Sequence, residues 1–473
     1  MISSDISNKA PDHSKASTID TPSTPSTPSI PSTPSTPSKP SIPSIPSTPS
    51  TPVLIITYYW PPSGGAGVQR WLKFSKYLPE TGWEPVILTV DTEYAVYPFI
   101  DSSLNEDVPA NLKVYRTKAL NWFRIYAKDK SRIPSAGFAR NDDKTLKGRI
   151  SRFIRGNFFI PDPRRGWNRY AFKKASAIIK DLEIKHIITT GPPHSTHLIG
   201  RILRKKHPEI RWISDLRDPW TEIFYYEQFY PTFISRSIDR CFEKSVLKGS
   251  DALITVSNSF RDSFCTLEKN AGSKFSVIAN GYDPQDLEGL ASIIPERLTI
   301  SYTGTFSEAY PVNGLIAALK KLTEKNTDLV VRFAGDVPGK IKHFITQQLP
   351  VQTVEFHPYM IHRQALQFML NSTILVLLIP ENQGNRGIIP GKLFEYLAAK
   401  KAILCLGPED SDSAAIIDKL RAGKTKTYDD VGGIMEFIED VSSGKFRVGE
   451  ENPVEYSRQY LARRIADVLN DLD

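Results

Sequence analysis

Cysteine is scarce in this sequence of 473 residues: there are three, Cys241, Cys265 and Cys405, far apart in the chain. An odd number at such spacing fits neither a disulfide framework nor a metal-binding motif, so we expect a reducing compartment. Long apolar runs are missing as well. No stretch approaches the roughly 18 apolar residues that a membrane-spanning helix needs, and the polar N-terminus carries no apolar signal core. The sequence therefore predicts a cytoplasmic protein without a membrane-spanning helix.

Motifs of several well-known enzyme classes are also missing. There is no Walker motif, no His/Cys metal box and no Gly-x-Ser-x-Gly elbow, which argues against a P-loop NTPase, a zinc hydrolase and an α/β-hydrolase. Neither sign of charge dominates, because the net charge of +8 is small for this length. Since none of the familiar nucleic-acid signatures occurs either, no nucleic-acid partner is expected.

Proline, by contrast, is abundant, and most of the excess among its 36 residues lies in residues 1–52. Thr-Pro-Ser and Ile-Pro-Ser triplets repeat there up to Pro52. Proline at every third position removes amide donors, favours extended conformations and leaves almost nothing that can form a core. Residues 1–52 are therefore predicted to be a disordered low-complexity tail. A spacer or partner-binding role and a dispensable repeat expansion both fit this composition.

From residue 53 the chain alternates between runs typical of parallel strands, most of them apolar, and amphipathic stretches typical of helices. A turn at 280–283 and a linker separate two series of runs. The first covers residues 53–60, 86–90, 113–117, 186–190, 211–216, 251–256 and 275–280, and the second covers 298–304, 330–336, 353–357, 374–379, 402–407 and 424–429. We predict an α/β fold of two Rossmann-like doubly wound domains, residues 53–283 and 284–452.

The remaining residues, 453–473, have the pattern of an amphipathic helix, which we expect to pack back towards the first domain. Its predicted apolar stripe consists of Tyr456, Tyr460, Leu461, Ile465, Val468 and Leu469.

Two strand ends in the first half carry candidate ligand-binding residues, because ligands of doubly wound sheets bind at the carboxyl ends of strands. The glycine loop, Gly64, Gly65 and Gly67, follows the first predicted strand. It lets the backbone approach a ligand closely, or it serves tight packing alone. His194 and His197 follow the strand at 186–190. Such a histidine could bond a phosphate or a sugar hydroxyl, or both could be incidental beside a helix cap.

A third strand end carries two carboxylates and a cation in one short turn: Asp215, Arg217 and Asp218. Such a cluster forms either a buried ion network or a catalytic base with its partner.

The segment 387–400 in the second half reads as a glycine- and proline-containing loop that turns into a helix. Gly391 and Lys392 lie where the helix begins, and Glu395 lies one turn further on the same side. A helix N-terminus offers unpaired N–H groups to a phosphate, and a lysine adds a point charge. The carboxylate of Glu395 could accept hydrogen bonds from sugar hydroxyls.

Residues 118–174 interrupt the α/β alternation and interleave Arg and Lys with aromatic residues. A basic amphipathic helix is predicted within 144–160. The pattern suits the surface of an anionic membrane, and it equally suits a solvated helical insertion.

Several motifs along the chain have counterparts in one enzyme family. They are YYWPPSGGAGVQR at 58–70, GPPHSTHLIG at 191–200, DLRDPW at 215–220, NGYD at 280–283, YTGTF at 302–306 and PGKLFEYLAAKKAIL at 390–404. Together they resemble the GT-B glycosyltransferases, and more narrowly the family 4 type, retaining enzymes of bacterial surface-polysaccharide pathways. The resemblance covers the chain from residue 53 to the C-terminus.

The resemblance implies that the first domain binds an acceptor and the second binds a nucleotide-diphosphate sugar, with no metal or other cofactor. It places Glu395 at the nucleotide ribose and Lys392 at the diphosphate, together with Gly391, Gly304 and the glycine loop. The sequence departs from the family pattern at Gly387, where a first glutamate is usual. No cation occurs in 307–314, so Lys392 is expected to bind the diphosphate either alone or with the help of Arg386.

A further departure concerns the first domain, where Arg217 and Asp218 stand in place of a histidine that is common in the family. Asp218 is therefore the predicted general base or acceptor-orienting group, and His194 is the second candidate. The expected activity is a hexosyl-type transfer to a glycan or lipid-linked acceptor, at the inner face of the cell membrane. A GT-B sugar-nucleotide epimerase and a non-catalytic GT-B-like partner in glycan assembly are the alternatives.

Overall fold

The computed structural model describes residues 50–98, 100–120, 122, 145–307 and 310–473. Nearly all of the predicted tail, and residues 121 and 123–144 of the predicted insertion, lie outside these ranges. The first strand, β1 (Thr51–Ile56), takes in Thr51 and Pro52, which the sequence assigned to the tail. Thr51 donates its N–H to the carbonyl of Gly82 at 2.9 Å, and Pro52 pairs with one neighbouring strand only, so its missing N–H interrupts no second ladder.

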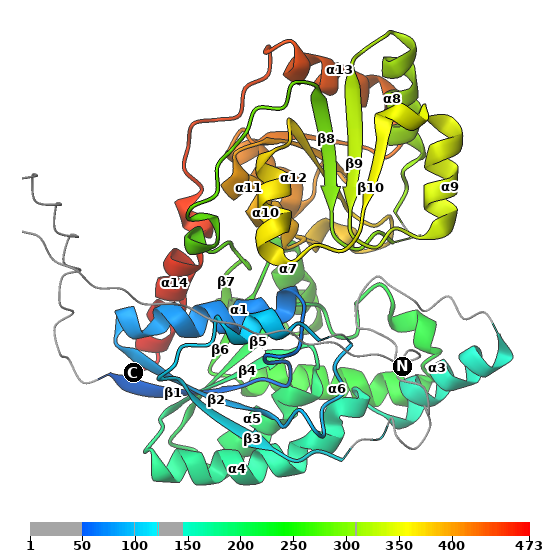
Figure 1. The fold of residues 1–473 in the computed structure, drawn as a ribbon. Helices are drawn as coiled ribbons and strands as arrows, with labels where there is room; N and C mark the ends of the chain where they lie inside the picture. The colour runs from blue at the N-terminus through cyan, green and yellow to red at the C-terminus, as the bar shows by residue number, and fades with distance from the viewer. Residues whose placement is uncertain (1–49, 99, 121, 123–144, 308–309) are drawn as a thin grey trace, which may run out of the picture. The chain divides into compact units, whose positions relative to one another are not determined.

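Two parallel sheets organise this part of the chain (Figure 1). The first has seven strands in the order β3-β2-β1-β4-β5-β6-β7. Its further strands are β2 (Trp83–Val90), β3 (Lys113–Thr117), β4 (His186–Gly191), β5 (Arg211–Leu216), β6 (Ala252–Thr255) and β7 (Phe275–Val277). The helices of this half are α1 (Ala66–Tyr77), α3 (Leu146–Phe158), α4 (Asn168–Asp181), α5 (Ser195–Lys206), α6 (Phe233–Gly249) and α7 (Asn258–Leu267).

The second sheet has six strands in the order β10-β9-β8-β11-β12-β13. They are β8 (Leu298–Thr303), β9 (Leu329–Ala334), β10 (Val354–His357), β11 (Ile374–Leu378), β12 (Ala402–Leu406) and β13 (Gly423–Lys426). The helices are α8 (Asn313–Glu324), α9 (Gly339–Gln348), α10 (His362–Leu370), α11 (Lys392–Ala399), α12 (Asp412–Lys419) and α13 (Val431–Ser442). Short 3-10 turns that matter below are η4 (Pro163–Trp167), η5 (Tyr226–Phe229), η7 (Pro284–Leu287) and η9 (Asn385–Gly387).

Each strand of the two sheets overlaps one of the strands predicted from the sequence, so the predicted α/β class is confirmed. Every residue of β4, β11 and β12 is buried. This burial is expected for central parallel strands that helices cover on both faces. The basic helix predicted within 144–160 is also present, as α3.

The C-terminal segment forms a 3-10 turn, η10 (Val454–Tyr456), and then α14 (Arg458–Asn470). Ser457 separates the two because its Oγ accepts a hydrogen bond from the N–H of Tyr460 at 3.2 Å and caps the helix. The apolar side of α14 belongs to the core of the first sheet, beside α1 (Figure 1); its buried residues there are Leu461, Ala462, Ile465, Ala466, Val468 and Leu469. Tyr460, which the predicted stripe included, is instead 38% exposed.

No helix in the described part of the chain combines the length and the apolar character that crossing a membrane requires.

Candidate functional site

Ligands of doubly wound sheets bind where the strand order reverses. This switch point lies between β8 and β11 in the second sheet and between β1 and β4 in the first. The chain reaches Gly304 directly after β8 and reaches Lys392 through the loop after β11. The glycine loop follows β1, and His194 follows β4. The structure therefore brings predicted site residues to the switch point of each sheet.

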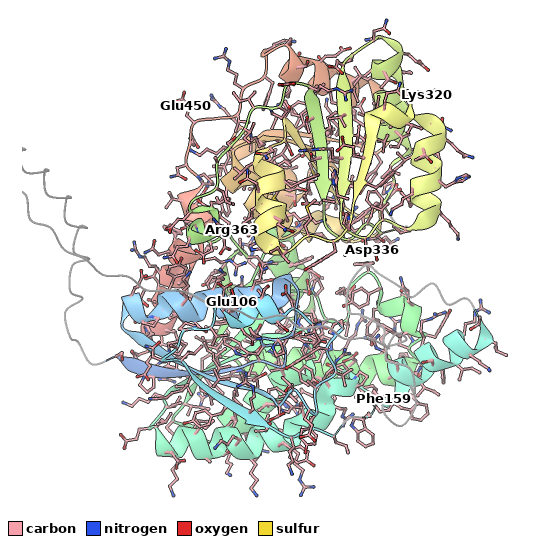
Figure 2. All side chains as sticks on the ribbon, viewed as in Figure 1. Glu106, Phe159, Lys320, Asp336, Arg363 and Glu450 are labelled. Carbon is pink, nitrogen blue, oxygen red and sulfur yellow. The ribbon has the colours of Figure 1, made fainter. Side chains whose placement is uncertain are left out.

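Two glycines shape the end of the second sheet. Gly304 has φ +100° and Gly335, after β9, has φ +126°, a backbone conformation that favours glycine. A Cβ on Gly335 would lie 2.5 Å from the carbonyl oxygen of Gly304, so the two loops meet backbone to backbone. Asp336 follows in the same loop (Figure 2). The two glycines therefore allow the loops after β8 and β9 to pack closely at this strand end.

Lys392 lies against these loops. Its Nζ donates a hydrogen bond to the Tyr302 hydroxyl at 2.7 Å and lies 4.1 Å from the centre of that ring. A Cβ on Gly304 would lie 2.8 Å from Cε of Lys392, so the absence of a side chain there makes room for the lysine. Burial lowers the pKa of Lys392 to about 7, although the charge of Glu395 opposes the shift. An amine held in this way gains a proton readily when an anion binds beside it.

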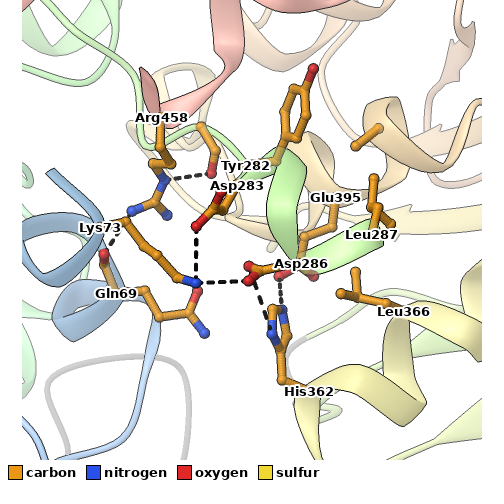
Figure 3. A pocket seen from close by; sticks show the side chains of 12 residues that line it. Gln69, Lys73, Tyr282, Asp283, Asp286, Leu287, His362, Leu366, Glu395 and Arg458 are labelled. Atoms are coloured by element: carbon orange, nitrogen blue, oxygen red, sulfur yellow. Dashed lines mark hydrogen bonds and ion pairs between the residues drawn. The ribbon is translucent and has the colours of Figure 1, made fainter. Parts of the chain in front are cut away.

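Glu395, one turn along α11, lines a pocket with residues of α1, η7, α10 and α14 (Figure 3). Its Oε1 lies 2.9 Å from Nε2 of His362. Burial lowers the pKa of His362, but the hydrogen bond to Glu395 and the charges of Glu395 and Asp286 outweigh this and raise it. His362 is therefore the present partner of the carboxylate that the sequence assigned to a ribose.

The same pocket contains a dense charge network around Lys73. Its Nζ lies 2.7 Å from Asp286 and 3.1 Å from Asp283 (Figure 3). A third carboxylate, that of Asp107, lies 3.1 Å from the same Nζ. Burial alone would raise the pKa of Asp283, but Lys73, a hydrogen bond from Tyr77 and Lys76 lower it to about 2. The network thus ties α1 to the segment that leads into the second sheet, beside Glu395.

The structure does not bring Arg386 to Lys392. Its guanidinium pairs with Asp410 at 2.7 Å, and its side chain is 66% exposed. Gly387, where a glutamate was expected, is buried against α7. A Cβ there would lie 2.3 Å from Cδ1 of Phe260. An aromatic ring therefore occupies the space that a side chain at position 387 would need.

In the first sheet, Arg217 joins the two loops at the switch point. Its guanidinium donates to the carbonyls of Gly67 at 2.8 Å, Gly191 at 2.9 Å and Pro192 at 2.9 Å. A Cβ on Gly67 would lie 2.4 Å from Nη1 of Arg217, so this glycine serves tight packing. Gly65, at φ 109°, immediately precedes α1. Arg217, the cation of the predicted cluster, therefore holds the backbone of the loops after β1 and β4 in place.

Asp215 belongs to a buried ion network. Its carboxylate accepts hydrogen bonds from Arg70 at 2.9 and 3.1 Å, from Trp71 Nε1 at 2.7 Å and from the Thr190 hydroxyl at 2.9 Å. Asp218, in contrast, is partly exposed. Burial and the charge of Asp215 raise the pKa of Asp218, against the lowering effect of Arg217. Of the two carboxylates, Asp218 is therefore the one that a ligand can reach.

The two histidines at the end of β4 differ in their surroundings. His197 is buried, and its Nδ1 lies 3.0 Å from the Thr189 hydroxyl. The ring of His194 stacks on that of Trp220, with centroids 4.9 Å apart. Burial, His197 and Arg217 hold the pKa of His194 well below its usual range, so the ring is neutral. Its Nδ1 is buried without a hydrogen-bond partner among the described residues.

His194 lines a pocket that opens to solvent, which we call the α3–α6 cavity. Its other walls include Arg155, Arg164, Tyr225, Phe229 and Asp239. The sequence indicated His194 and the basic segment 118–174 as separate features. It did not predict that they line one cavity, because the lining residues come from α3, η4, η5 and α6, which are distant in the sequence.

The described residues contain no group of three His, Cys, Asp or Glu side chains placed to hold a metal ion. No protein-family model matches the sequence, and no curated protein matches it.

Solved structures match most of the chain. A glycosyltransferase from Rickettsia africae is 13% identical with a TM-score of 0.59, and the match covers 89% of this chain and 98% of that one. Anabaena HepE in complex with UDP is 11% identical with a TM-score of 0.56, covering 89% and 100%. A Listeria monocytogenes protein assigned as a UDP-N-acetylglucosamine 2-epimerase is 10% identical with a TM-score of 0.51, covering 89% and 96%. The chain therefore has the GT-B fold, with two Rossmann-like sheets.

Proposed function

We propose that this protein is a glycosyltransferase that moves a sugar from a nucleotide-diphosphate sugar to a hydroxyl group of a glycan or lipid-linked acceptor. The observation that carries the proposal is the partly buried amine of Lys392 between Tyr302 and Gly304 at the switch point of the second sheet. HepE, which shares the fold, has been solved with UDP and with UDP-glucose. A diphosphate bound at the switch point of the second sheet would meet Lys392.

On the donor side, Lys392 has the chemistry to neutralise a leaving diphosphate. The amine takes up a proton as the phosphates bind, because negative charge beside it favours the ammonium form. The start of α11 at Gly391 adds N–H donors and the positive end of the helix dipole. Glu395 would exchange His362 for ribose hydroxyls, and the exchange would leave His362 beside Asp286.

On the acceptor side, Asp218 and His194 are the candidates for holding the reacting hydroxyl. His194 is neutral and has a free Nδ1, so it can accept or donate one hydrogen bond. Asp218 has a raised pKa, which suits a group that shares a proton with a hydroxyl. We propose a retaining, metal-independent reaction of the family 4 type, in which the leaving phosphate assists removal of the acceptor proton.

The proposed place of action is the cytoplasmic side of a membrane, in the assembly of a surface polysaccharide. α3 supports peripheral docking, because it exposes the cations Lys147 and Arg149 and carries no acidic residue. Three apolar side chains of α3 are at least half exposed to solvent: Leu146, Ile150 and Phe158. Cations beside apolar side chains are the pattern expected at the surface of an anionic bilayer.

Two other functions have a specific observation in their favour. The likeness to the Listeria protein favours a sugar-nucleotide epimerase. Phe260 in the side-chain space of Gly387 favours a non-catalytic partner in glycan assembly, because position 387 cannot present a carboxylate to a sugar.

An assay of nucleotide release distinguishes the transferase, the epimerase and the non-catalytic partner. The purified protein is incubated with a panel of UDP- and GDP-sugars and a membrane extract as acceptor source. A transferase releases UDP or GDP; an epimerase converts the sugar nucleotide without release; a non-catalytic partner does neither. Lys392→Ala should abolish most of the release, and Lys320→Ala, an exposed lysine of α8, should not. No nucleotide above the blank, together with unchanged cellular glycans in Glu395→Ala cells, would refute the transferase.

A further inference from the structure

The α3–α6 cavity combines buried cations with aromatic walls. Arg155 and Arg164 are 8% and 4% exposed, so both guanidinium groups lie inside the protein at the cavity wall. Arg155 lies 4.0 Å from the centre of the Phe229 ring, and Arg164 lies 5.9 Å from that of Tyr59. Guanidinium groups fixed against rings present their N–H donors in defined directions, which suits bidentate recognition of phosphate.

The cavity also contains two carboxylates, and neighbouring donors hold both. Asp162 accepts hydrogen bonds from the Ser195 N–H at 2.8 Å and the Ser195 hydroxyl at 2.9 Å. Asp239 accepts from Trp220 Nε1 at 2.7 Å and from the Tyr226 hydroxyl at 3.0 Å. Burial raises the pKa of Asp239 to about 6, so this carboxylate remains mostly ionised at pH 7, with both oxygens engaged by these donors. The carboxylates therefore organise the walls and oppose an anion only in part.

The helices that frame the cavity expose apolar side chains on the outside. Asn157 holds the end of α3 against the start of α6: its Oδ1 accepts from the Thr232 N–H at 2.7 Å and from the Ser235 hydroxyl at 2.8 Å. Phe158 is 70% exposed, Phe233 is 84% exposed and Ile234 is 69% exposed. Phe159, labelled in Figure 2, follows at the end of α3. Exposed apolar side chains clustered near a binding site mark an interaction surface.

We infer that the α3–α6 cavity binds the phosphorylated head of a lipid-linked acceptor while Phe158, Phe233 and Ile234 enter the membrane that carries its tail. This inference rests on the proposed transferase function and names its acceptor class. Arg155 and Arg164 hold the phosphate or diphosphate. His194, at the inner wall and at the switch point of the first sheet, faces the sugar or hydroxyl beyond the phosphate. The cations of α3, Lys147 and Arg149 among them, complement anionic lipid around the site.

Binding of a soluble lipid diphosphate tests this without any donor sugar. The probe is farnesyl diphosphate, compared with farnesol and with inorganic diphosphate by calorimetry on the full chain. Farnesyl diphosphate should bind at least about tenfold more tightly than either comparison compound, since it alone uses both cations and apolar walls. Arg155→Gln and Arg164→Gln should each weaken it about tenfold or more, and exposed Arg447→Gln should not.

A second measurement keeps the test decisive if an arginine variant folds poorly. Phe233→Ser with Ile234→Ser alters only exposed side chains and should reduce flotation with anionic vesicles several-fold while leaving farnesyl diphosphate affinity unchanged. Equal affinity for inorganic and farnesyl diphosphate would overturn the lipid-linked assignment in favour of a soluble phosphate. Full farnesyl diphosphate affinity in folded arginine variants would overturn the cavity as its site. Neither result bears on nucleotide release, which tests the donor site separately.

Discussion

Replacing Lys392 by Met should weaken binding of a nucleotide-diphosphate sugar and remove a pH dependence. The ammonium group would make a charge-assisted hydrogen bond to phosphate from a site where it is already partly buried. Losing such a bond costs about 1–3 kcal/mol, which is about 5- to 150-fold in affinity. Calorimetric titration with UDP-glucose measures the change, and Lys320→Met on the surface of α8 serves as the matched control.

The pH dependence follows from the pKa of the lysine. In the free protein burial holds this pKa at about 7, so the amine is protonated below pH 7 and neutral above it. Bound phosphates raise the pKa, so the complex retains the proton to higher pH. Affinity is therefore constant below pH 7 and falls above it, by up to about tenfold per pH unit, until the pKa of the complex is reached.

UDP-glucose suits this experiment because both of its phosphates are diesters and keep a constant charge over the range. Lys392→Met should give a weak and flat profile from pH 6 to pH 9, within about twofold. An equally tight, equally pH-dependent profile in the variant would refute the assignment of Lys392 to the diphosphate.

Three further predictions concern stability. Lys392→Met should raise the melting temperature by about 2–4 °C or more at pH 7, because the lowered pKa of Lys392 means that folding opposes its charged form. The gain in melting temperature should shrink as the pH rises from about 7 towards 10.5. A variant that melts at a lower temperature than the native protein contradicts this prediction. Gly387→Glu should cost about 1–3 kcal/mol of unfolding free energy by chemical denaturation, since Phe260 fills the space, and Phe260→Ala should relieve part of that cost. Asp215→Asn should cost about 3–5 kcal/mol, because it leaves buried Arg70 without a carboxylate partner; a loss under about 1 kcal/mol would show that the network is not structural.

The elements of this fold could be read from the sequence because their signals are local. β11 and β12 are unbroken apolar runs, and every residue in them is buried. The boundary of the tail was less accurate, because Thr51 is recruited into β1 by the carbonyl of Gly82, which no local pattern around Thr51 reveals. Tyr460 was misplaced for a related reason: helical spacing puts it near the apolar stripe of α14, but its ring faces solvent.

The candidate site was less predictable because its decisive contacts join distant parts of the chain. Arg217 lay in a plausible catalytic cluster, yet its three acceptors are carbonyls of two other loops. Glu395 was named, but its partner His362 was not, since it comes from another helix. The space opposite Gly387 is filled by Phe260 from the other half of the chain. Such pairings follow from tertiary packing, which the spacing of residues along the sequence does not reveal.

A crystal structure of the complex with UDP or a UDP-sugar tests the central claim most directly. We expect a diphosphate oxygen within hydrogen-bond distance of Nζ of Lys392, at the end of β8, and the ribose hydroxyls on Glu395 in place of His362. A nucleotide bound at another strand end, with Nζ still on the Tyr302 hydroxyl and Glu395 still on His362, would contradict the account.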